Sequence, residues 1–166
     1  MAKIEKFYGD ILMINVEASV GARGVNNKND VMVVQAMLKY ALEGRPFFRS
    51  MRFPEPTGVM DGATSELIRQ YQRYLRVKDK VNVSVDGVIS RAVGERAFGK
   101  RGKWTILCLN THVLEARLLR GGNGNHFQDL CSKFPQLRSV LDDIPVGTLN
   151  LQLESSGVGS LGLTLA

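Results

Sequence analysis

The fold is decided by residues 56–75, which read PTGVMDGATSELIRQYQRYL. A polar turn containing glycine stands directly before a run whose apolar residues recur at helical spacing. Asp61 or Thr64 is placed to cap a helix, because short polar side chains at this position accept hydrogen bonds from free N–H groups. The residues expected to point inward are Leu67, Ile68, Tyr71 and Leu75. The stretch therefore predicts a turn that sets the start of a helix.

A second copy of this turn follows at residues 86–93, which read DGVISRAV. Aligned with TGVMDGAT at residues 57–64, it keeps the Gly-Val-apolar core and an alanine in register. In each copy a glycine reverses the chain, and Met60 or Ile89 lies beneath the turn. From Asp86 onward, helical spacing of Ile89, Val93, Ala97 and Phe98 predicts a helix. The two copies form an internal half-repeat.

The segments before the first copy predict one strand and one helix. Alternation of Leu12, Ile14, Val16 and Ala18 favours a strand within residues 10–20. Asn29 or Asp30 is expected to cap the next helix, which Gly44 and Pro46 close. Its apolar stripe consists of Val31, Val34, Leu38, Ala41 and Leu42.

Residues 104–166 predict more helix and then a change of period. Residues 104–120 have the broad apolar face of a buried helix, and two short helices are expected on either side of Pro135. Leucines alternate with other residues at 149–153 and at 161–165, which predicts a β-hairpin. Because two strands alone are marginal in water, we expect the hairpin to pair with the strand around residues 12–16. The expected parts are an N-terminal strand (1–19), a helical domain (20–103) and a C-terminal segment (104–166).

Three stretches together resemble a known family: GVNNKNDVMVVQAML, TGVMDGATSELIRQYQRYL and VDGVISRAV. They are similar to the small three-helix peptidoglycan-binding domain found beside bacterial cell-wall hydrolases and in some phage and secretion-system proteins. The resemblance covers about residues 20–98. Val93 and Ser90 depart from it, standing where the family has threonine and glycine. The matching positions are Val34-Gln35, Thr64, Leu67-Ile68, Tyr71-Gln72 (with Tyr for Phe) and Asp86-Gly87.

The resemblance implies a mainly α fold, a three-helix module with half-repeats, and non-catalytic binding of peptidoglycan. The C-terminal helices and a small sheet of the N-terminal strand and the hairpin complete the expected fold. Gln35 and Gln72 are expected to bond loop backbone and hold the repeats together. The other motif residues are Gly58, Asp61, Thr64, Tyr71, Asp86 and Gly87, of which Tyr71 is expected to pack in the core and Thr64 to cap. The candidate ligand contacts are the polar residues beside the turns and helix faces: Asn26, Asn27, Arg69, Arg73, Tyr74 and Asn82.

The charge distribution also suggests an anionic partner. The net charge is +6, and residues 1–103 carry 18 basic and 11 acidic residues against 4 and 5 in residues 104–166. Nucleic acid, an acidic membrane surface and a carboxylate-rich wall polymer all fit such a balance. Arg69, Arg73, Arg76, Lys78 and Lys80 could follow phosphates, but without a stacking sheet or a recognition helix nucleic acid is not the expected partner.

The sequence holds no convincing catalytic or metal centre, so we expect no enzyme activity, no metal and no cofactor. Cys108 and His112 are four residues apart on a predicted helix, but no nucleophile turn accompanies them. With His126 and Cys131 they make a formal zinc set. Residues five apart on a helix, however, differ by roughly 140° in direction.

No apolar run approaches the roughly 18 residues of a membrane span, and the N-terminal residues lack a secretory apolar region. We therefore expect synthesis in the cytoplasm and arrival at the wall by lysis, a phage particle or a dedicated secretion system. The alternative is an adaptor of a phage-tail-like or secretion assembly that uses the C-terminal hairpin for protein contact.

Overall fold

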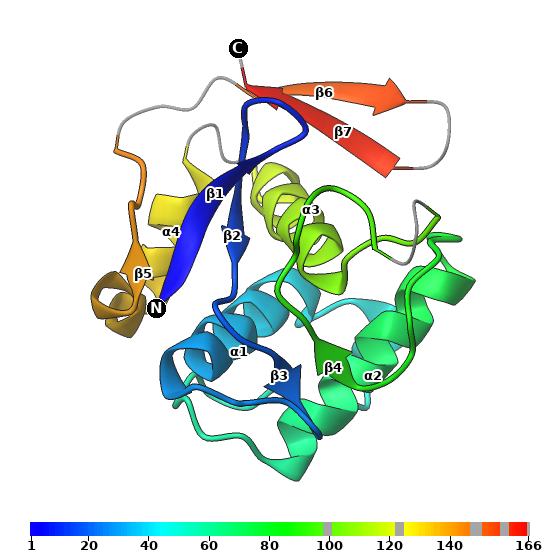
Figure 1. Cartoon of the computed structure of the whole chain (residues 1–166), viewed down its shortest axis with the longest axis vertical. Helices are drawn as coiled ribbons and strands as arrows, with labels where there is room; N and C mark the ends of the chain where they lie inside the picture. Colours follow the sequence, from blue (N-terminus) through cyan, green and yellow to red (C-terminus); the bar gives the residue numbers. More distant parts are fainter. Residues whose placement is uncertain (98–100, 122–124, 147–150, 157–159, 166) are drawn as a thin grey trace.

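The computed structural model describes residues 1–97, 101–121 and 125–146, together with the backbone of residues 151–156 and 160–165. The fold is mixed α/β, and its described part has four α-helices: α1 (Lys28–Leu42), α2 (Gly62–Val77), α3 (Thr105–Leu119) and α4 (His126–Lys133). Two short 3₁₀ helices, η1 (Pro46–Phe48) and η2 (Pro135–Ser139), follow α1 and α4. Figure 1 shows α1 at the centre of the molecule, with α2 and α3 around it.

The strands form three small sheets. β1 (Ala2–Phe7) pairs with β2 (Ile11–Asn15) as an antiparallel hairpin, and β5 (Leu141–Asp142) adds a short parallel pairing at Ala2 and Lys3. β3 (Val20–Gly21) pairs with β4 (Val88–Ile89). β6 (Leu151–Ser156) and β7 (Ser160–Leu165) form the predicted C-terminal hairpin.

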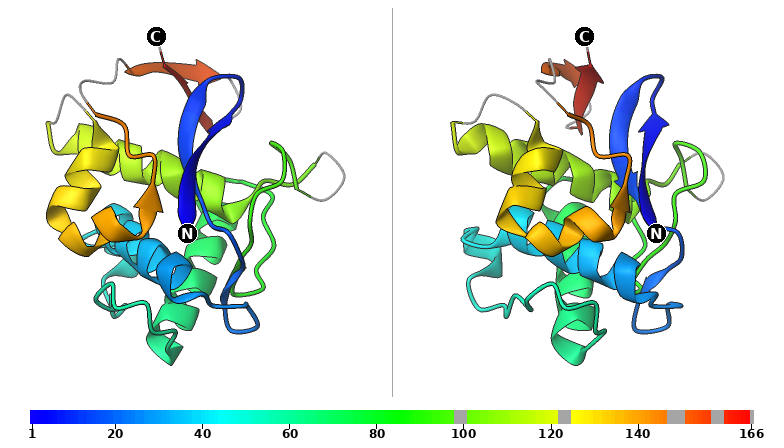
Figure 2. Two further views of the ribbon diagram at one scale, coloured as in Figure 1. Left: turned by 60° about the vertical axis from the view of Figure 1, so that its left-hand side comes forward. Right: turned by 90° about the vertical axis from the view of Figure 1, so that its left-hand side faces the viewer.

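The predicted pairing between that hairpin and the strand around residues 12–16 is wrong. β6 and β7 form a two-stranded sheet of their own, and the partner of β2 is β1. The turn between β1 and β2 has a left-handed backbone at Tyr8 (φ +49°) and Gly9 (φ +86°), which is the conformation typical of a tight hairpin turn. The loop between β1 and β2 is short, so their pairing costs little closure entropy. In addition, the backbone of Ile14 in β2 is bonded by Asn110 of the helix α3, whose Oδ1 accepts from the Ile14 N–H at 2.6 Å and whose Nδ2 donates to the Ile14 carbonyl at 2.8 Å. Figure 2 shows the β1–β2 hairpin crossing α3, against which β2 packs.

The third helix expected from Asp86 onward is also absent. Residues 86–97 hold the short strand β4 followed by irregular backbone, and Val93, expected to point inward, is 73% exposed. β-branched Val88 and Ile89 suit pairing with β3, and Gly94 takes a left-handed φ of +71°, which a helix does not allow. Phe98 lies outside the described residues. The next helix along the chain is α3, which packs against α1.

The capping residues differ in part from the predicted ones. α1 is preceded by Asn27, not Asn29 or Asp30, as its N-cap. Asp30 is buried in the first turn, and its carboxylate accepts from the N–H groups of Glu17 and Ala18, both at 3.0 Å. Of the two candidates for α2, Asp61 is the cap, accepting from the Thr64 N–H at 2.7 Å.

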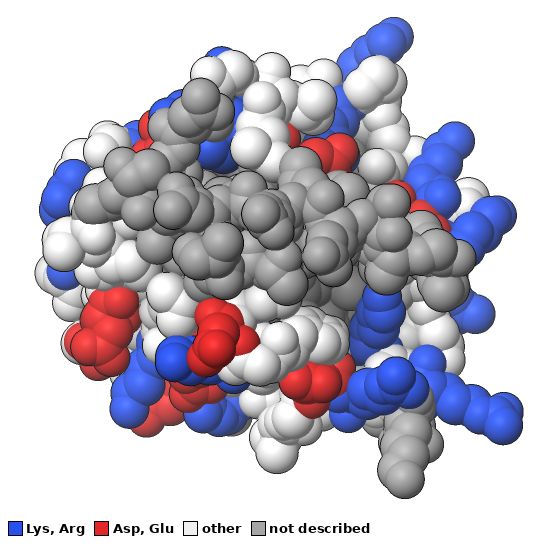
Figure 3. All heavy atoms as spheres, turned by 90° about the horizontal axis from the view of Figure 1, so that it is seen from above, with Lys and Arg blue, Asp and Glu red and all other residues white. Residues whose placement is uncertain are grey.

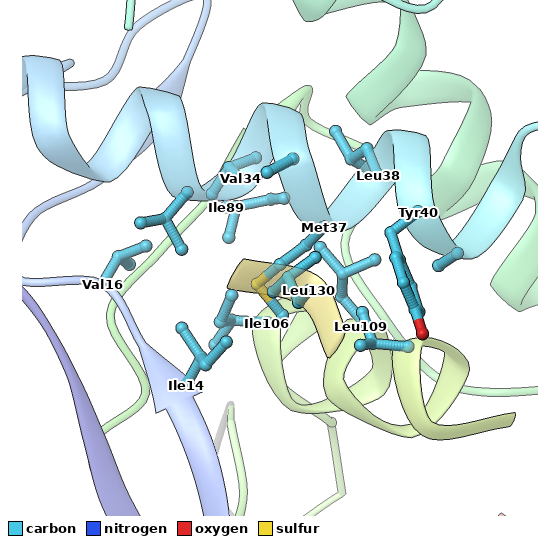
Figure 4. Packing of buried hydrophobic residues seen from close by; sticks show 14 of the residues in the cluster. Ile14, Val16, Val34, Met37, Leu38, Tyr40, Ile89, Ile106, Leu109 and Leu130 are labelled. Atoms are coloured by element: carbon cyan, nitrogen blue, oxygen red, sulfur yellow. The ribbon is translucent and has the colours of Figure 1, made fainter. Parts of the chain in front are cut away.

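One hydrophobic core joins β1 to β5 and α1 to α4, and it contains residues of all three predicted parts, 1–19, 20–103 and 104–166. Ile14 of β2, Met37 of α1, Ile106 of α3 and Leu130 of α4 meet in it (Figure 4). The apolar stripes predicted for α1 and α2 are confirmed, since each of their members is buried. Within the described residues no helix has the length and apolar content to cross a bilayer.

Candidate ligand-binding surface

Gln35 of α1 holds the first glycine turn through hydrogen bonds of both its side-chain oxygen and its side-chain nitrogen. Its Oε1 accepts from the backbone N–H groups of Thr57 at 3.1 Å and Gly58 at 3.0 Å. Its Nε2 donates to the Val59 carbonyl at 2.9 Å and to Thr64 Oγ1 at 3.0 Å. The turn and the first residues of α2 are thereby fixed to α1.

Gln72 of α2 holds the second turn in the same way. Its Oε1 accepts from the Gly87 N–H at 2.8 Å, and its Nε2 donates to the Val88 carbonyl at 3.0 Å. The same Nε2 lies 3.0 Å from Asp86 Oδ1 and 3.4 Å from Thr105 Oγ1. The expectation that both amides bond loop backbone is met by these hydrogen bonds.

Thr105, and not Val93, is the counterpart of Thr64 in the second copy. Both threonines lie in the first turn of a helix, and both hydroxyls lie within hydrogen-bond distance of the glutamine amide that holds their turn. Thr64 stands six residues after Gly58, whereas Thr105 stands eighteen after Gly87. The second copy therefore has an insertion between its turn and its helix. Because of this insertion, Thr105 does not align with Thr64 when the two copies are compared in sequence. The apolar run after Thr105 was the one signal that could have identified it.

Both turns require glycine, and the second turn lies against the side chain of Arg69. Gly58 and Gly87 have φ angles of +79° and +74°. A Cβ on Gly58 would lie 2.6 Å from the Lys28 carbonyl oxygen, and one on Gly87 would lie 3.2 Å from Arg69 Nη2. The guanidinium of Arg69 thus rests against the second turn.

Three of the predicted contact residues lie near the end of the β3–β4 ribbon. Asn27 is exposed before α1, and Asn26 bonds Gly21, the residue that faces Val88 in the ribbon. The Asn26 amide is used within its own turn, accepting from the Gly21 N–H at 2.8 Å and donating to the Gly21 carbonyl at 2.9 Å. Asn26 is therefore a turn residue, whereas Asn27 and Arg69 remain open to a ligand.

Arg73 continues this surface along α2. It is exposed and stands one helical turn after Arg69, with the exposed Arg76 beyond it. None of these three arginines forms an ion pair with a described residue. Figure 3 shows lysine and arginine side chains gathered along one edge of the molecule, the edge that carries α2 and the segment before α3 in Figure 1.

Tyr74 and Asn82 lie apart from this surface. The Tyr74 ring packs against Phe47, Phe48 and His112, with centroids 5.1, 5.3 and 5.7 Å away. Asn82 joins two chain segments, since its carbonyl accepts from the Lys103 N–H at 2.9 Å and its Nδ2 donates to the Arg101 carbonyl at 3.3 Å. Tyr74 therefore acts in packing, and Asn82 in joining the segment before α3 to its own.

Tyr71 lies in a buried polar network that the sequence did not reveal. Its hydroxyl is 2.7 Å from His112 Nδ1, and His112 Nε2 is 3.0 Å from the Asp79 carboxylate. Burial raises the pKa of Tyr71 well above its usual value, so the phenol stays protonated. The predicted core position of Tyr71 is confirmed, and the network ties α2 to α3.

Burial shifts the pKa values of two residues of the formal zinc set, Cys108 and His126. Burial raises the pKa of the Cys108 thiol to about 12, which disfavours the nucleophilic thiolate. Burial lowers the pKa of His126 to about 4, and its Nδ1 has no hydrogen-bond partner in the described structure. In the described part of the chain, no three His, Cys, Asp or Glu side chains are grouped to hold a metal.

A cleft that no sequence pattern indicated lies between the β1–β2 turn and residues 91–95. It has a volume of about 430 Å³ and is lined by residues 5–9 and 91–95. Arg91 and Glu5 form an ion pair there, with Nη2 and Oε1 2.7 Å apart. The segment 91–95 belongs to the insertion before α3, so only the folded chain brings it to β1.

Comparisons with protein-family models, with curated proteins and with solved structures found no match. The function is therefore inferred from the residues themselves. The features that bear on it are the paired glutamine-held turns, the exposed arginines of α2, and the cleft.

Proposed function

We propose that this protein is a non-catalytic module that binds bacterial peptidoglycan. The observation that carries the proposal is the duplicated turn: a buried glutamine amide holds a left-handed glycine, and a threonine starts the next helix, at Gln35–Gly58–Thr64 and again at Gln72–Gly87–Thr105. Gln35, Thr64, Gln72 and Gly87 of these two turns are among the positions on which the chain resembles the three-helix peptidoglycan-binding domain.

The surface beside the second turn has chemistry that suits the wall. Arg69 is held at Gly87, Arg73 is exposed one turn further, and Asn27 is exposed before α1. Peptidoglycan offers free carboxylates on its stem peptides and hydroxyls and amides elsewhere. An arginine can bind a carboxylate through two parallel hydrogen bonds. Binding through exposed charges is expected to be modest and to weaken with salt.

The test is co-sedimentation of the full chain with purified, insoluble sacculi at low and moderate salt. We expect saturable pelleting that decreases with salt, and a loss of about three- to tenfold in affinity for Arg73→Ala. Arg138→Ala, which removes an exposed arginine on η2 away from α2, serves as the matched control and should pellet like the parent. Protein that stays in the supernatant under all conditions rejects wall binding.

A second candidate function is favoured by the isolation of the C-terminal hairpin. β6 and β7 pair with each other and with no other described strand. The outer edge of each strand therefore keeps backbone groups that a strand of another chain can bond. The proposed role is that of an adaptor in a phage-tail-like or secretion assembly, which would also carry the protein to the wall.

Light scattering after size-exclusion chromatography separates the two functions. An adaptor should self-associate, or need its partner chain, through residues 149–166, and their deletion should abolish that association. A wall-binding module should be monomeric and should keep its pelleting with sacculi after the same deletion.

A further inference from the structure

We infer that the cleft between the β1–β2 turn and residues 91–95 binds a short peptide that carries both a free ammonium group and a free carboxylate. The cleft is distinct from the α2 surface, so the inference stands whether or not the protein binds the wall. Its volume of about 430 Å³ falls within the range of sites for small ligands.

Arg91 provides the site for the carboxylate. Its Nη2 donates to Glu5 at 2.7 Å and its Nη1 to the Val16 carbonyl at 3.1 Å, so the guanidinium is held in place. These bonds use two of the five N–H donors of an arginine, and the side chain is 40% exposed. The guanidinium therefore keeps donors for an anion on this side of the cleft.

Carboxylates in the same cleft provide the site for the ammonium group. Glu95 is exposed, and its side chain makes no ion pair with a described residue. Burial acts to raise the pKa of Glu5, but hydrogen bonds from Asn15 and Arg91 outweigh it and lower that pKa below the usual value. Glu5 is therefore ionised at neutral pH.

The remaining lining favours a peptide over other small ions. Tyr8 is 42% exposed, and its hydroxyl donates to the Glu95 carbonyl at 3.2 Å, which orients the ring at the cleft. Val93, 73% exposed, adds a second apolar contact for a side chain. A polyanion such as nucleic acid would meet the carboxylates of Glu5 and Glu95, whereas a zwitterion places an opposite charge beside each group.

The test is a titration of the ¹⁵N-labelled full chain with trialanine, followed by NMR. We expect saturable shifts confined to residues 5–9 and 91–95. Amidation of the peptide carboxylate, or acetylation of its amine, should weaken binding at least about fivefold, because each removes one charge contact. Glu95→Gln should weaken trialanine about three- to tenfold and leave the acetylated peptide unaffected, while Arg91→Lys should lower the preference for the free carboxylate.

The matched control is Glu66→Gln, an exposed glutamate on α2, which should bind trialanine like the parent. The Glu95 side chain is exposed and has no ion pair with a described residue, so Glu95→Gln is expected to fold. This variant therefore still tests the site if Arg91→Lys fails to fold. Shifts that do not saturate, equal binding of the blocked peptides, or unchanged affinity in folded Glu95→Gln would overturn the inference. Sedimentation with sacculi that depends on Arg73 but occurs without trialanine binding would reject the peptide site and leave wall binding intact.

Discussion

Gln35 and Gln72 show how single side chains set the geometry of this chain. Each is buried, and each amide bonds both the N–H and C=O groups of a glycine turn. A buried polar group left without a partner costs about 1–3 kcal/mol, so loss of either amide would release the turn. Gly58 and Gly87 are as necessary as the amides, because their backbone is left-handed and Lys28 and Arg69 lie close to where a Cβ would stand.

Gly58→Ala should destabilise the protein more than Gly44→Ala. Both glycines have left-handed φ angles, +79° and +89°, so both alanines pay a conformational cost of about 1–2 kcal/mol. Only at Gly58 does the new Cβ meet backbone, 2.6 Å from the Lys28 carbonyl oxygen, while nothing lies within 4 Å at Gly44. Urea unfolding should therefore show a further loss of at least about 1 kcal/mol for Gly58→Ala. Equal losses would mean that α1 shifts away without cost.

At the scale of elements, α1 and α2 start in different ways. The Asp61 side chain caps α2, whereas Asn27 precedes α1 without a side-chain cap hydrogen bond. The hydrogen bond from Thr64 lowers the pKa of Asp61 below its usual value of 3.8. A lowered pKa in the folded state means that the cap stabilises the protein above the unfolded-state value and that this stability is lost as the pH falls.

Asp61→Ala should cost about 1 kcal/mol of unfolding free energy at pH 7, because it removes a working N-cap. Asn27→Ala is the matched control and should change stability by less than about 0.5 kcal/mol. The difference between Asp61→Ala and the parent should narrow as the pH falls below 3.8, where the parent loses its cap as well. Urea titrations at several pH values measure this, and a gap that does not change with pH would contradict the capping role.

At the scale of the whole molecule, the hydrophobic core does not divide between residues 1–103 and 104–166, although the charge of the sequence differs between these two parts. Residues from β1 to β5 belong to a single cluster, with α1 packed against α3. The Tyr71–His112–Asp79 network adds polar contacts between α2 and α3. Elements that share one core lose their contacts together, which favours cooperative unfolding.

Thermal unfolding should therefore give coincident transitions by far-UV circular dichroism and by the fluorescence of Trp104. Trp104 is the one tryptophan of the chain, and it packs against the core at the start of α3. Circular dichroism reports all the helices at once, so agreement of the two curves indicates one cooperative unit. An earlier transition at Trp104 would show that the C-terminal segment unfolds separately.

The sequence by itself determined the three long helices, the glycine turns, the two glutamine contacts and the C-terminal hairpin. The helices, the turns and the hairpin depend on residues close in the chain, whose period or backbone preference is visible locally. The glutamine contacts reach further along the chain, and they follow from an amide beside a buried stripe, which needs hydrogen-bond partners. The exposure of Arg73 on α2 followed from the same periodicity. The turn role of Asn26 and the packing of Tyr74 did not, because a polar or aromatic residue beside a turn suits both a ligand contact and a structural role.

Only the tertiary structure decided the pairing of β2 with β1, the place of α3 as the third helix, and the match of Thr105 with Thr64. It also decided the cleft, whose two sides come from residues 5–9 and 91–95. The place of α3, the position of Thr105 and the cleft join segments far apart in the chain, so no local pattern reveals them. The β1–β2 pairing joins neighbouring segments through a short loop of low closure entropy. The irregular segment before α3 has no periodic signal. It separates Thr105 from the second turn in the sequence, whereas in the folded chain the Thr105 hydroxyl lies near the glutamine that holds this turn.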